Sequence, residues 1–377
     1  MRILLFGPYP RRGEKISGGI MAVVHTLAQG MAQRPDTQVI VASASSFGPE
    51  VVETRGNIIH HRLLIPPRPR SRWHGKIRHK LVTLAHTVHP DIIHAHGTAY
   101  YANAALDSGF PAVITAHGVV YEEAKRSSAR NFKAWLAWQY DAYVEKKLLQ
   151  RAQHLIAISP YIRQAFARYP HLQWTDIPNP VDDRFFRIVQ QPEPERLLVP
   201  ARVIPRKGTD LILQAFAQIA HQFPKASLRI AGETTSFPDF VQRCQSIVQK
   251  HQLAQRVHFL GSLQPQALME EYSRASCVIL PARQETAPVV IEEAMAAGCP
   301  VIATRVGGVP WMVAHQRTGL LVQPENVSAL AAALKRTLGK PHELRAWRQQ
   351  TVQAAQQYKI DAVLAKTLTL YHQISHV

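Results

Sequence analysis

Residues 284–304 read Gln284-Glu-Thr-Ala-Pro-Val-Val-Ile-Glu-Glu-Ala-Met-Ala-Ala-Gly-Cys-Pro-Val-Ile-Ala-Thr304. Pro288 suits the first turn of a helix, because a first-turn N–H has no intrahelical acceptor and its loss costs little. The apolar run that follows predicts a short buried helix over residues 289–297. Gly298 is the expected C-cap, and the proline two residues later stops the helix before a strand at 301–303.

Two carboxylates flank the start of this helix. Glu285 lies in the preceding loop, and Glu293 lies about one and a half turns inside the helix. The free N–H groups of a helix N-terminus favour an anion, whereas acids beside them suit neutral hydroxyl groups. A ligand that carries both a phosphate and sugar hydroxyls satisfies both demands. The working hypothesis is therefore a nucleotide-sugar site.

The bulk composition is that of a globular chain with two cores. At 377 residues, 46% of them hydrophobic, the chain exceeds the size at which one core keeps growing. No run approaches the ~20 apolar residues of a membrane span, and the first seven residues favour a strand over a signal peptide. The three widely spaced cysteines indicate buried thiols in a reducing cytoplasm and no disulfide framework.

The charge balance is strongly basic. The chain has 44 Lys and Arg against 26 Asp and Glu, a formal net charge of +18. Such an excess predicts an anionic partner, which charge alone leaves open among phospholipid headgroups, nucleic acid and an acidic polymer.

Short apolar runs alternate with helical patterns in two successive series, which is typical of βαβ units and a parallel sheet. The expected strands are residues 3–6, 39–42, 58–62, 92–94, 112–115 and 155–158, then 197–199, 228–230, 257–260, 278–280, 301–303 and 319–322. The other expected helices are residues 20–31, 73–88, 99–107, 131–151, 209–221, 239–251, 264–274, 327–338, 342–358 and 361–374. Pro- and acid-rich residues at 179–183 and 190–195 are the clearest linker. We predict an α/β chain with domains at 1–187 and 195–359, and a ligand in a cleft at the carboxyl ends of the strands.

Several loops at those strand ends carry residues suited to a phosphate. Gly18 and Gly19 join the first strand to the first helix, where glycines let the backbone approach a phosphate or simply form an ordinary turn. Arg202 and Lys207 lie between a strand and a helix and are candidates to neutralise a diphosphate. Arg206 is expected to be a surface residue.

Three histidines follow strands of the first series. His117, with a glycine behind it, is the better candidate for a hydrogen bond to a substrate, whereas His94 and His96 are as well explained by a structural role in a loop. Their spacing matches no usual zinc pattern, and the chain has no Asp-x-Asp to hold a divalent ion. We therefore expect no metal and no other cofactor.

Residues 62–80 form a basic segment that contains a tryptophan. Its cations are Arg62, Arg68, Arg70, Arg72, Lys76, Arg78 and Lys80, and no acid occurs between Glu53 and Asp91. If residues 73–88 form a helix, Trp73, Ile77 and Leu81 share one face. That pattern suits an amphipathic helix on an anionic membrane, or a stripe that faces the core. Trp135 and Trp138 could line an acceptor groove or pack internally.

The motifs taken together resemble a known family over essentially the whole chain. They are Glu285-x7-Glu293-Ala-Met-Ala, Arg202 with Lys207-Gly208, Gly18-Gly19, His117-Gly118, Ile177-Pro-Asn-Pro-Val-Asp182, Phe259-Leu-Gly261 and Thr318-Gly-Leu-Leu-Val322. The chain is similar to the retaining GT-B glycosyltransferases of family 4. The resemblance implies two Rossmann-like domains with parallel sheets facing across a cleft, and a last helix, about 360–377, that packs back on the first domain.

The resemblance also implies roles for single residues. Glu293 would hold ribose hydroxyls and Glu285 the hydroxyls of the donor sugar. Arg202 and Lys207 would take the diphosphate, and Gly19 would let the N-terminal loop reach it. The remaining implied contacts are His117 beside the reacting carbon and Leu263 at the base.

The loop after Glu285 departs from the family pattern. Many members carry Gly-Phe-Gly there, whereas this chain has Thr286-Ala287-Pro288. Since proline lacks an N–H, part of the phosphate contact is expected to shift to Val289 and Val290.

These points predict a cytoplasmic transferase, peripheral on the membrane, that moves sugar from a UDP- or GDP-sugar to a glycan or lipid-linked acceptor of the cell envelope. One alternative is a nucleotide-sugar epimerase of the same architecture, which needs no acceptor. The other is a nucleic-acid-binding protein, which charge alone favours and which leaves the paired glutamates unexplained. We expect no nucleic-acid partner.

Overall fold

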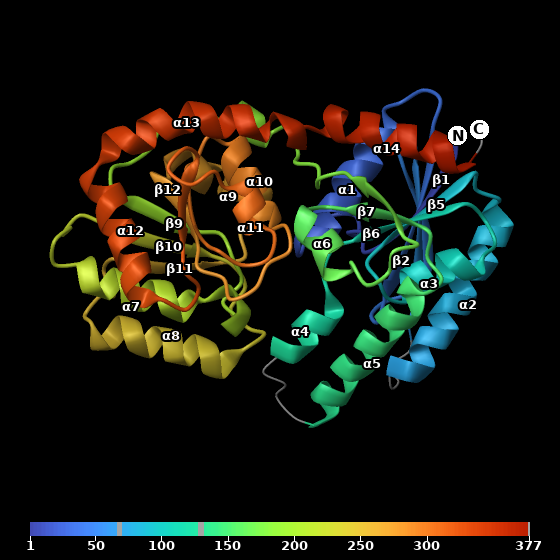
Figure 1. Cartoon of the computed structure of the whole chain (residues 1–377), viewed down its shortest axis with the longest axis horizontal. Helices are drawn as coiled ribbons and strands as arrows, with labels where there is room; N and C mark the ends of the chain where they lie inside the picture. Colours follow the sequence, from blue (N-terminus) through green and yellow to red (C-terminus); the bar gives the residue numbers. More distant parts are fainter. Residues whose placement is uncertain (66–69, 127–131, 376–377) are drawn as a thin grey trace. The chain divides into compact units, whose positions relative to one another are not determined.

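The computed structural model describes residues 1–65, 70–126 and 132–375 (Figure 1), the side chains of 70–73, 125–126 and 132–134 excepted. Two compact units make up the chain. Unit 1 comprises Met1–Pro180 together with Ile360–Val377, and unit 2 comprises Val181–Lys359. The prediction of an α/β chain with two parallel sheets is confirmed.

Unit 1 is built on an eight-stranded sheet of order β3-β4-β2-β1-β5-β6-β7-β8. Its strands are β1 (Arg2–Phe6), β2 (Gln38–Ser45), β3 (Val51–Arg55), β4 (Ile58–Leu64), β5 (Ile92–His96), β6 (Ala112–Ala116), β7 (His154–Ala157) and β8 (Gln173–Asp176). Every neighbouring pair is parallel except β3 and β4, which form an antiparallel edge. The inner strands are almost fully buried, as expected of a parallel sheet with helices on both faces.

The helices of unit 1 are α1 (Gly19–Ala32), α2 (Arg70–Val88), α3 (Tyr100–Asp107), α4 (Val120–Arg126), α5 (Phe132–Leu149), α6 (Pro160–Ala165) and α14 (Ile360–Ser375). The last helix belongs to this unit because it packs on α1. Gly30 permits that approach: a Cβ there would lie 2.6 Å from Cγ1 of Ile360 and 2.8 Å from Cδ1 of Leu364.

Unit 2 has a six-stranded parallel sheet of order β11-β10-β9-β12-β13-β14. Its strands are β9 (Arg196–Val199), β10 (Ser227–Ala231), β11 (Val257–Gly261), β12 (Cys277–Leu280), β13 (Val301–Thr304) and β14 (Gly319–Val322). Its α-helices are α7 (Thr209–Ile219), α8 (Pro238–Lys250), α9 (Pro265–Arg274), α10 (Val289–Ala296), α11 (Val309–Met312), α12 (Val327–Gly339) and α13 (Pro341–Ala355). All three cysteines are buried free thiols, as predicted.

The structure differs from the predicted strands and helices at a few places. The strands β3 and β8 were not predicted, because both lie at sheet edges and carry polar side chains among the apolar ones. The short helices α4, α6 and α11 were also missed. Pro288 is the N-cap of α10 and does not lie in its first turn, while Gly298 has the left-handed φ of 73° expected after the helix.

The amphipathic reading of α2 is decided in favour of the core. Ile77, Leu81 and Ala85 are at most 1% exposed, so the apolar stripe of this helix packs inside unit 1. Burial of that stripe stabilises the unit by roughly 25 cal/mol per Å² of apolar surface. This face of α2 is therefore not available to enter a membrane.

Candidate functional site

The loops that follow β9 and β12 are joined at the carboxyl edge of the unit 2 sheet. The N–H of Arg283 donates to the carbonyl of Arg206 at 2.8 Å. Gly208 ends the turn between them and α7 with a left-handed φ of 70°. A Cβ at Gly208 would lie 2.0 Å from the carbonyl oxygen of Pro281. Only glycine fits this close contact, which fixes where Arg206 and Lys207 stand.

Glu285 is the centre of a buried charge cluster in these loops. Only 5% of the surface of Glu285 is exposed. The ammonium of Lys207 donates to Oε1 of Glu285, and Arg206 Nη1 lies 3.5 Å from Oε2. Arg206 also donates to the carbonyl of Gln284 at 3.2 Å. The expectation of a plain surface role for Arg206 was wrong, because its guanidinium turns back onto the acid.

The cluster carries more positive than negative charge. Arg202 is exposed and, with Arg206, lowers the pKa of Lys207. The chief cause of that lowering is burial, which Glu285 opposes by favouring the ammonium form. Three cations against one carboxylate leave a formal excess of two positive charges. Such an excess suits a diphosphate.

The N-terminus of α10 begins beside this cluster. Pro288 is its N-cap, and the N–H groups of Val289 and Val290 lie in the first turn, where no intrahelical acceptor exists. Ala287 is 9% exposed, so the loop before the helix is packed. The carbonyl of Glu285 accepts from the N–H of Gly308 at 3.3 Å. A rigid loop thus presents two amides at the positive end of a helix dipole.

Glu293 stands further along α10 in a different environment. The hydroxyl of Tyr272 donates to Glu293 Oε2 at 3.0 Å and to the carbonyl of Val290 at 3.3 Å. Burial raises the pKa of Glu293 to about 7, the hydrogen bond from Tyr272 opposes the rise, and Asp182 adds to it. Tyr272 is held edge-on against Phe185 at 5.6 Å. Near neutral pH Glu293 therefore exists in both protonation states.

The remaining unit 2 candidates lie at the neighbouring strand ends. Leu263 is half-buried in the loop after β11. Glu233 follows β10 and accepts from the N–H of Ser236 at 2.5 Å and from its hydroxyl at 2.6 Å. Burial raises the pKa of Glu233, but its hydrogen bonds to Ser236 and Thr235 outweigh this and lower the value to about 2. Glu233 is therefore charged, and its hydrogen bonds stabilise the turn that it begins.

The glycine pair of unit 1 opens α1. Gly18 is its N-cap with a φ of 84°, and Gly19 is its first residue. Both are exposed. A Cβ at Gly18 would meet nothing within 4 Å, so this glycine serves the backbone conformation and leaves open space in front of the turn.

Three histidines of unit 1 lie side by side on β5 and at the end of β6. His94 and His96 lie within β5 and are 1% and 2% exposed, so the strand runs two residues past its expected end at residue 94, and the structural role of these two histidines lies in the sheet and not in a loop. His117 follows β6 and is partly exposed. His96 Nδ1 lies 3.0 Å from His117 Nε2. Burial lowers the pKa of His94 and of His117 to about 3 and that of His96 well below its usual range, so all three are neutral.

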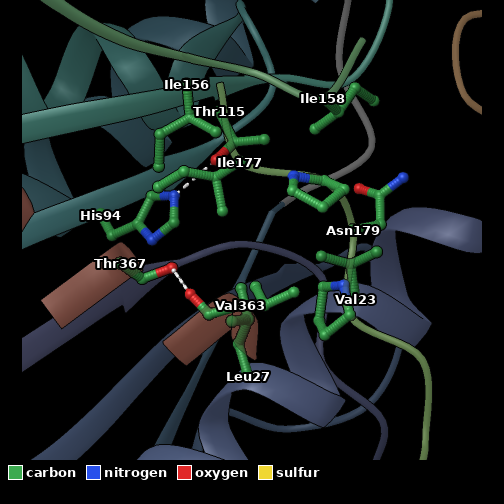
Figure 2. Close-up of a pocket in the computed structure, with 12 residues that line it drawn as sticks. Val23, Leu27, His94, Thr115, Ile156, Ile158, Ile177, Asn179, Val363 and Thr367 are labelled. Atoms are coloured by element: carbon green, nitrogen blue, oxygen red, sulfur yellow. Dashed lines mark hydrogen bonds between the residues drawn. The ribbon is translucent and has the colours of Figure 1, made fainter. Parts of the chain in front are cut away.

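A small cavity lies beside His94 (Figure 2). Its volume is about 10 Å³, and it is lined by His94, Thr115, Asn179 and Thr367 among apolar side chains. Such a space is about the size of one water molecule. The cavity is too small for a sugar and belongs to the core of unit 1.

The cations predicted in and just before α2 differ in whether an acid compensates their charge. Arg78 pairs with Asp107 at 2.7 Å, and Lys80 contacts Glu50, so two charges are partly compensated. Lys76 is exposed. Arg68 lies outside the described residues, and so do the side chains of Arg70, Arg72 and Trp73.

The two tryptophans of α5 differ in exposure. Trp135 is 46% exposed, whereas Trp138 is half-buried. Within the described part of the chain, no helix has the length and apolar character needed to cross a bilayer. The same residues contain no group of three or more His, Cys, Asp or Glu arranged to hold a metal ion.

Two family models match the chain. The model described as Glycosyl transferases group 1 matches residues 181–354, and that described as Glycosyltransferase Family 4 matches residues 17–185. Glycogen synthase from Mycobacterium tuberculosis is 30% identical over 261 residues, which cover 67% of this chain and 61% of that protein. The matched stretches span only 20% to 61% of the first three curated relatives, less than two thirds of each.

Solved structures share the fold over nearly the whole chain. Sucrose-phosphate synthase from Thermosynechococcus elongatus has a TM-score of 0.85 at 24% identity, covering 99% of this chain and 98% of that one. HepE from Anabaena in complex with UDP-glucose has a TM-score of 0.73 at 19% identity, covering 98% and 99%. At these identities the likeness concerns the fold.

Proposed function

The chain belongs to the GT-B glycosyltransferases of group 1, and on that premise we propose that it is a retaining, metal-independent hexosyltransferase. It moves a sugar from a UDP- or GDP-linked donor to a glycan or lipid-linked acceptor. Its place is in the synthesis of a cell-envelope polysaccharide or glycolipid.

The observation that carries this proposal is the cluster around Glu285. Arg206 and Lys207 hold one buried carboxylate directly before the N-terminus of α10, with Arg202 near them. The excess cations and the helix amides suit a diphosphate, and the carboxylate suits sugar hydroxyls. A nucleotide sugar offers both groups in one molecule.

The proposed roles follow the chemistry of each side chain. Lys207 and Arg202 neutralise the diphosphate together with the amides of Val289 and Val290. Glu293, in its carboxylate form, accepts from ribose hydroxyls, and Leu263 borders the base. In unit 1, His117 donates to the donor sugar or to its phosphate, and the open turn at Gly18 and Gly19 leaves room for phosphate oxygens.

The proposed reaction breaks the bond between the anomeric carbon and the phosphate oxygen. The electron pair leaves with the diphosphate, whose charge is stabilised by preorganised cations and helix amides. The acceptor hydroxyl attacks the same face, and its proton passes to a departing phosphate oxygen. This front-face course retains configuration. Transfer that continues in excess EDTA would support metal independence, and loss restored by Mg²⁺ or Mn²⁺ would refute it.

The donor is testable before the acceptor is known. We expect a thermal-shift screen to show strong stabilisation either by UDP and UDP-glucose or by GDP and GDP-mannose, and not by both pairs. Saturation at about 100 times Kd stabilises the folded state by about 2.7 kcal/mol. UDP-glucose is the first probe because HepE is solved with it. No shift with any nucleotide would overturn the proposal, and conversion of the donor sugar without an acceptor would point to an epimerase.

We further propose that the protein works at the cytoplasmic face of an anionic membrane, with its net charge of +18 supplying the attraction. Since the apolar stripe of α2 is buried, the contact is electrostatic. Vesicles with 30% phosphatidylglycerol should carry the protein upward in a flotation gradient, and 0.5 M NaCl should release it. Equal flotation with neutral vesicles, or none with either, would refute this part.

A further inference from the structure

The ring of His117 rests on a stack of two buried rings. The ring centroids of His96 and His117 are 5.3 Å apart at an interplanar angle of 24°, and those of His94 and His96 are 4.1 Å apart. His94 is fixed at both nitrogens: Nδ1 lies 2.6 Å from the hydroxyl of Tyr371, and Nε2 lies 2.6 Å from that of Thr115. The stack therefore gives His117 a rigid support.

His96 has one buried nitrogen without a partner. Its Nδ1 contacts His117 Nε2 at 3.0 Å, but its Nε2 has no hydrogen-bond partner in the described part of the chain. Gly7 leaves room for this side chain, because a Cβ there would lie 3.3 Å from His96 Cβ and 3.5 Å from the ring carbon Cδ2. The ring of His96 is thus buried, 2% exposed, with one nitrogen unused.

This unused nitrogen decides between two proton arrangements. A neutral imidazole carries one N–H, so a single proton occupies the contact between the two rings. If His117 supplied it, the proton of His96 would sit on Nε2 as a buried donor without an acceptor. If His96 supplies it, Nε2 is left as a bare acceptor. Orphaned buried donors are the rarer and costlier case, which favours donation from His96 Nδ1 to His117 Nε2.

We propose that His96 is a positioning residue that holds His117 in one ring orientation and as the Nδ1–H tautomer. Nδ1 of His117 has no hydrogen-bond partner among the described residues, and the ring is partly exposed. His117 then presents a fixed N–H donor to an oxygen of the ligand. The role in catalysis rests on the proposed glycosyl transfer, whereas the tautomer is a property of unit 1 alone.

The tautomer is measured directly by NMR on the full chain labelled with 15N-histidine at pH 7.5. Long-range 1H–15N spectra distinguish a protonated Nδ1 from a protonated Nε2, and a His117→Gln sample assigns the signals. We expect His117 to show one tautomer with its proton on Nδ1, and His96→Phe to give a mixture. A proton on Nε2 of His117 in the wild type, or no change in His96→Phe, would overturn the proposal.

Kinetics provide the second readout, with UDP-glucose as the probe and UDP release as the signal. His96→Phe should lower kcat by about 10- to 100-fold with little change in KM, because misplacing a group by about 1 Å costs on this order. His96→Asn, whose amide reaches the place of Nδ1, should restore most of the rate. The matched control is His94→Phe, which is equally buried, keeps an aromatic ring in the stack and removes only the hydrogen bonds to Tyr371 and Thr115. It should lower the melting temperature and leave kcat near wild type.

The two arms separate the proposal from the function on which it rests. Equal loss of kcat in His94→Phe and His96→Phe, with no rescue by Asn, would reduce His96 to a core residue and overturn the proposal. If the wild type neither binds UDP nor releases it from UDP-glucose, the donor assignment fails, and the tautomer is still decided by NMR.

Discussion

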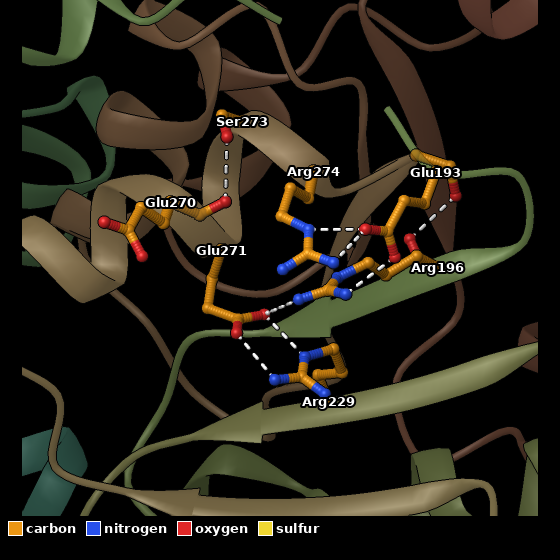
Figure 3. A network of polar contacts seen from close by, with 8 residues as sticks. Glu193, Arg196, Arg229, Glu270, Glu271, Ser273 and Arg274 are labelled. Carbon is orange, nitrogen blue, oxygen red and sulfur yellow. Dashed lines mark hydrogen bonds and ion pairs between the residues drawn. The ribbon is translucent and has the colours of Figure 1, made fainter. Parts of the chain in front are cut away.

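Two of the buried carboxylates of unit 2 that are each held by two cations, Glu271 and Glu285, lie at opposite ends of its sheet. Glu271 accepts from Arg196 at 3.0 Å and from two nitrogens of Arg229 at 2.7 Å each (Figure 3). Arg196 opens β9 and so marks the amino end of the strands. Glu285 follows β12 and lies at their carboxyl end.

The two clusters differ in how their charges are balanced. At the amino end a second acid, Glu193, pairs with Arg196 at 2.7 Å and also contacts Arg274. The arginines there each have a carboxylate partner. Around Glu285, by contrast, one acid stands among three cations, and one of these, Arg202, is exposed.

This contrast is the ground for proposing that similar residues serve different purposes in the two clusters. The network of Glu271 ties α9 to β9 and β10, and each of its arginines has a carboxylate partner. The cluster of Glu285 has donors left over, next to helix amides that also lack partners within α10. A buried ion pair is thus by itself no sign of a site, whereas the excess of donors at the carboxyl edge is the ground on which we propose one.

The largest expected effect is loss of transfer at the carboxyl-end cluster. Lys207→Ala removes an ammonium from the proposed diphosphate site, and Glu285→Gln removes the charge that orders it. Each should lower kcat/KM by at least about 100-fold, the scale seen for removal of one preorganised donor. Melting temperature and circular dichroism should show a folded protein. Turnover near the wild-type rate in either variant would refute the assignment.

The amino-end cluster should respond in the opposite way. Glu271→Gln leaves Arg196 and Arg229 without their shared acid and should destabilise the protein by about 3–5 kcal/mol, measured by urea unfolding. Turnover per folded molecule should be unchanged. The control is Glu193→Gln, which alters a carboxylate with 41% side-chain exposure and should cost about 0–1 kcal/mol. If Glu271→Gln abolished turnover while remaining stable, the comparison would fail.

A smaller effect should appear in the pH dependence of nucleotide binding. The pKa of Glu293 is about 7, and only its carboxylate form is proposed to accept from ribose. The Kd for UDP should therefore rise as pH falls through 7, approaching about tenfold per pH unit well below it. Isothermal titration between pH 6 and 8 measures this. Glu293→Gln should bind weakly with a flat profile, and an equally steep profile in that variant would assign the titration to another group.

The stability of the free protein should change in the reverse direction. The pKa of Glu293 in the folded state exceeds the unfolded value of 4.5, so the folded state binds more protons between these two values. Stability from this group is present below about pH 4.5 and is lost as pH rises to about 7. The melting temperature of Glu293→Gln relative to wild type should therefore increase from pH 5 to pH 8. A constant difference would show that Glu293 is not buried as described.

Sequence reasoning predicted what depends on local pattern. The inner strands are continuous apolar runs, and such runs predict buried parallel strands. The Glu285 and Lys207 motifs lie in loops whose place follows from the strand before them. In contrast, β3 and β8 have mixed side chains at sheet edges and gave no clear signal.

What sequence reasoning missed depends on contacts between distant segments. Arg206 reaches Glu285 because the two loops share a backbone hydrogen bond, and the hydroxyl of Tyr272 on α9 reaches Glu293 on α10. No spacing in the chain encodes either contact. The burial of α2 was left open for the same reason, since an amphipathic stripe looks alike whether it faces a core or a membrane.

The placement of α14 in unit 1 has a consequence for the order of folding during synthesis. Tyr371 supplies the hydroxyl beside His94, and α14 packs against Gly30 of α1. Tyr371 and the rest of α14 are translated after the whole of unit 2, which is contiguous in sequence. The strands of unit 1 are translated before unit 2, so the core of unit 1 is completed only when α14 has followed.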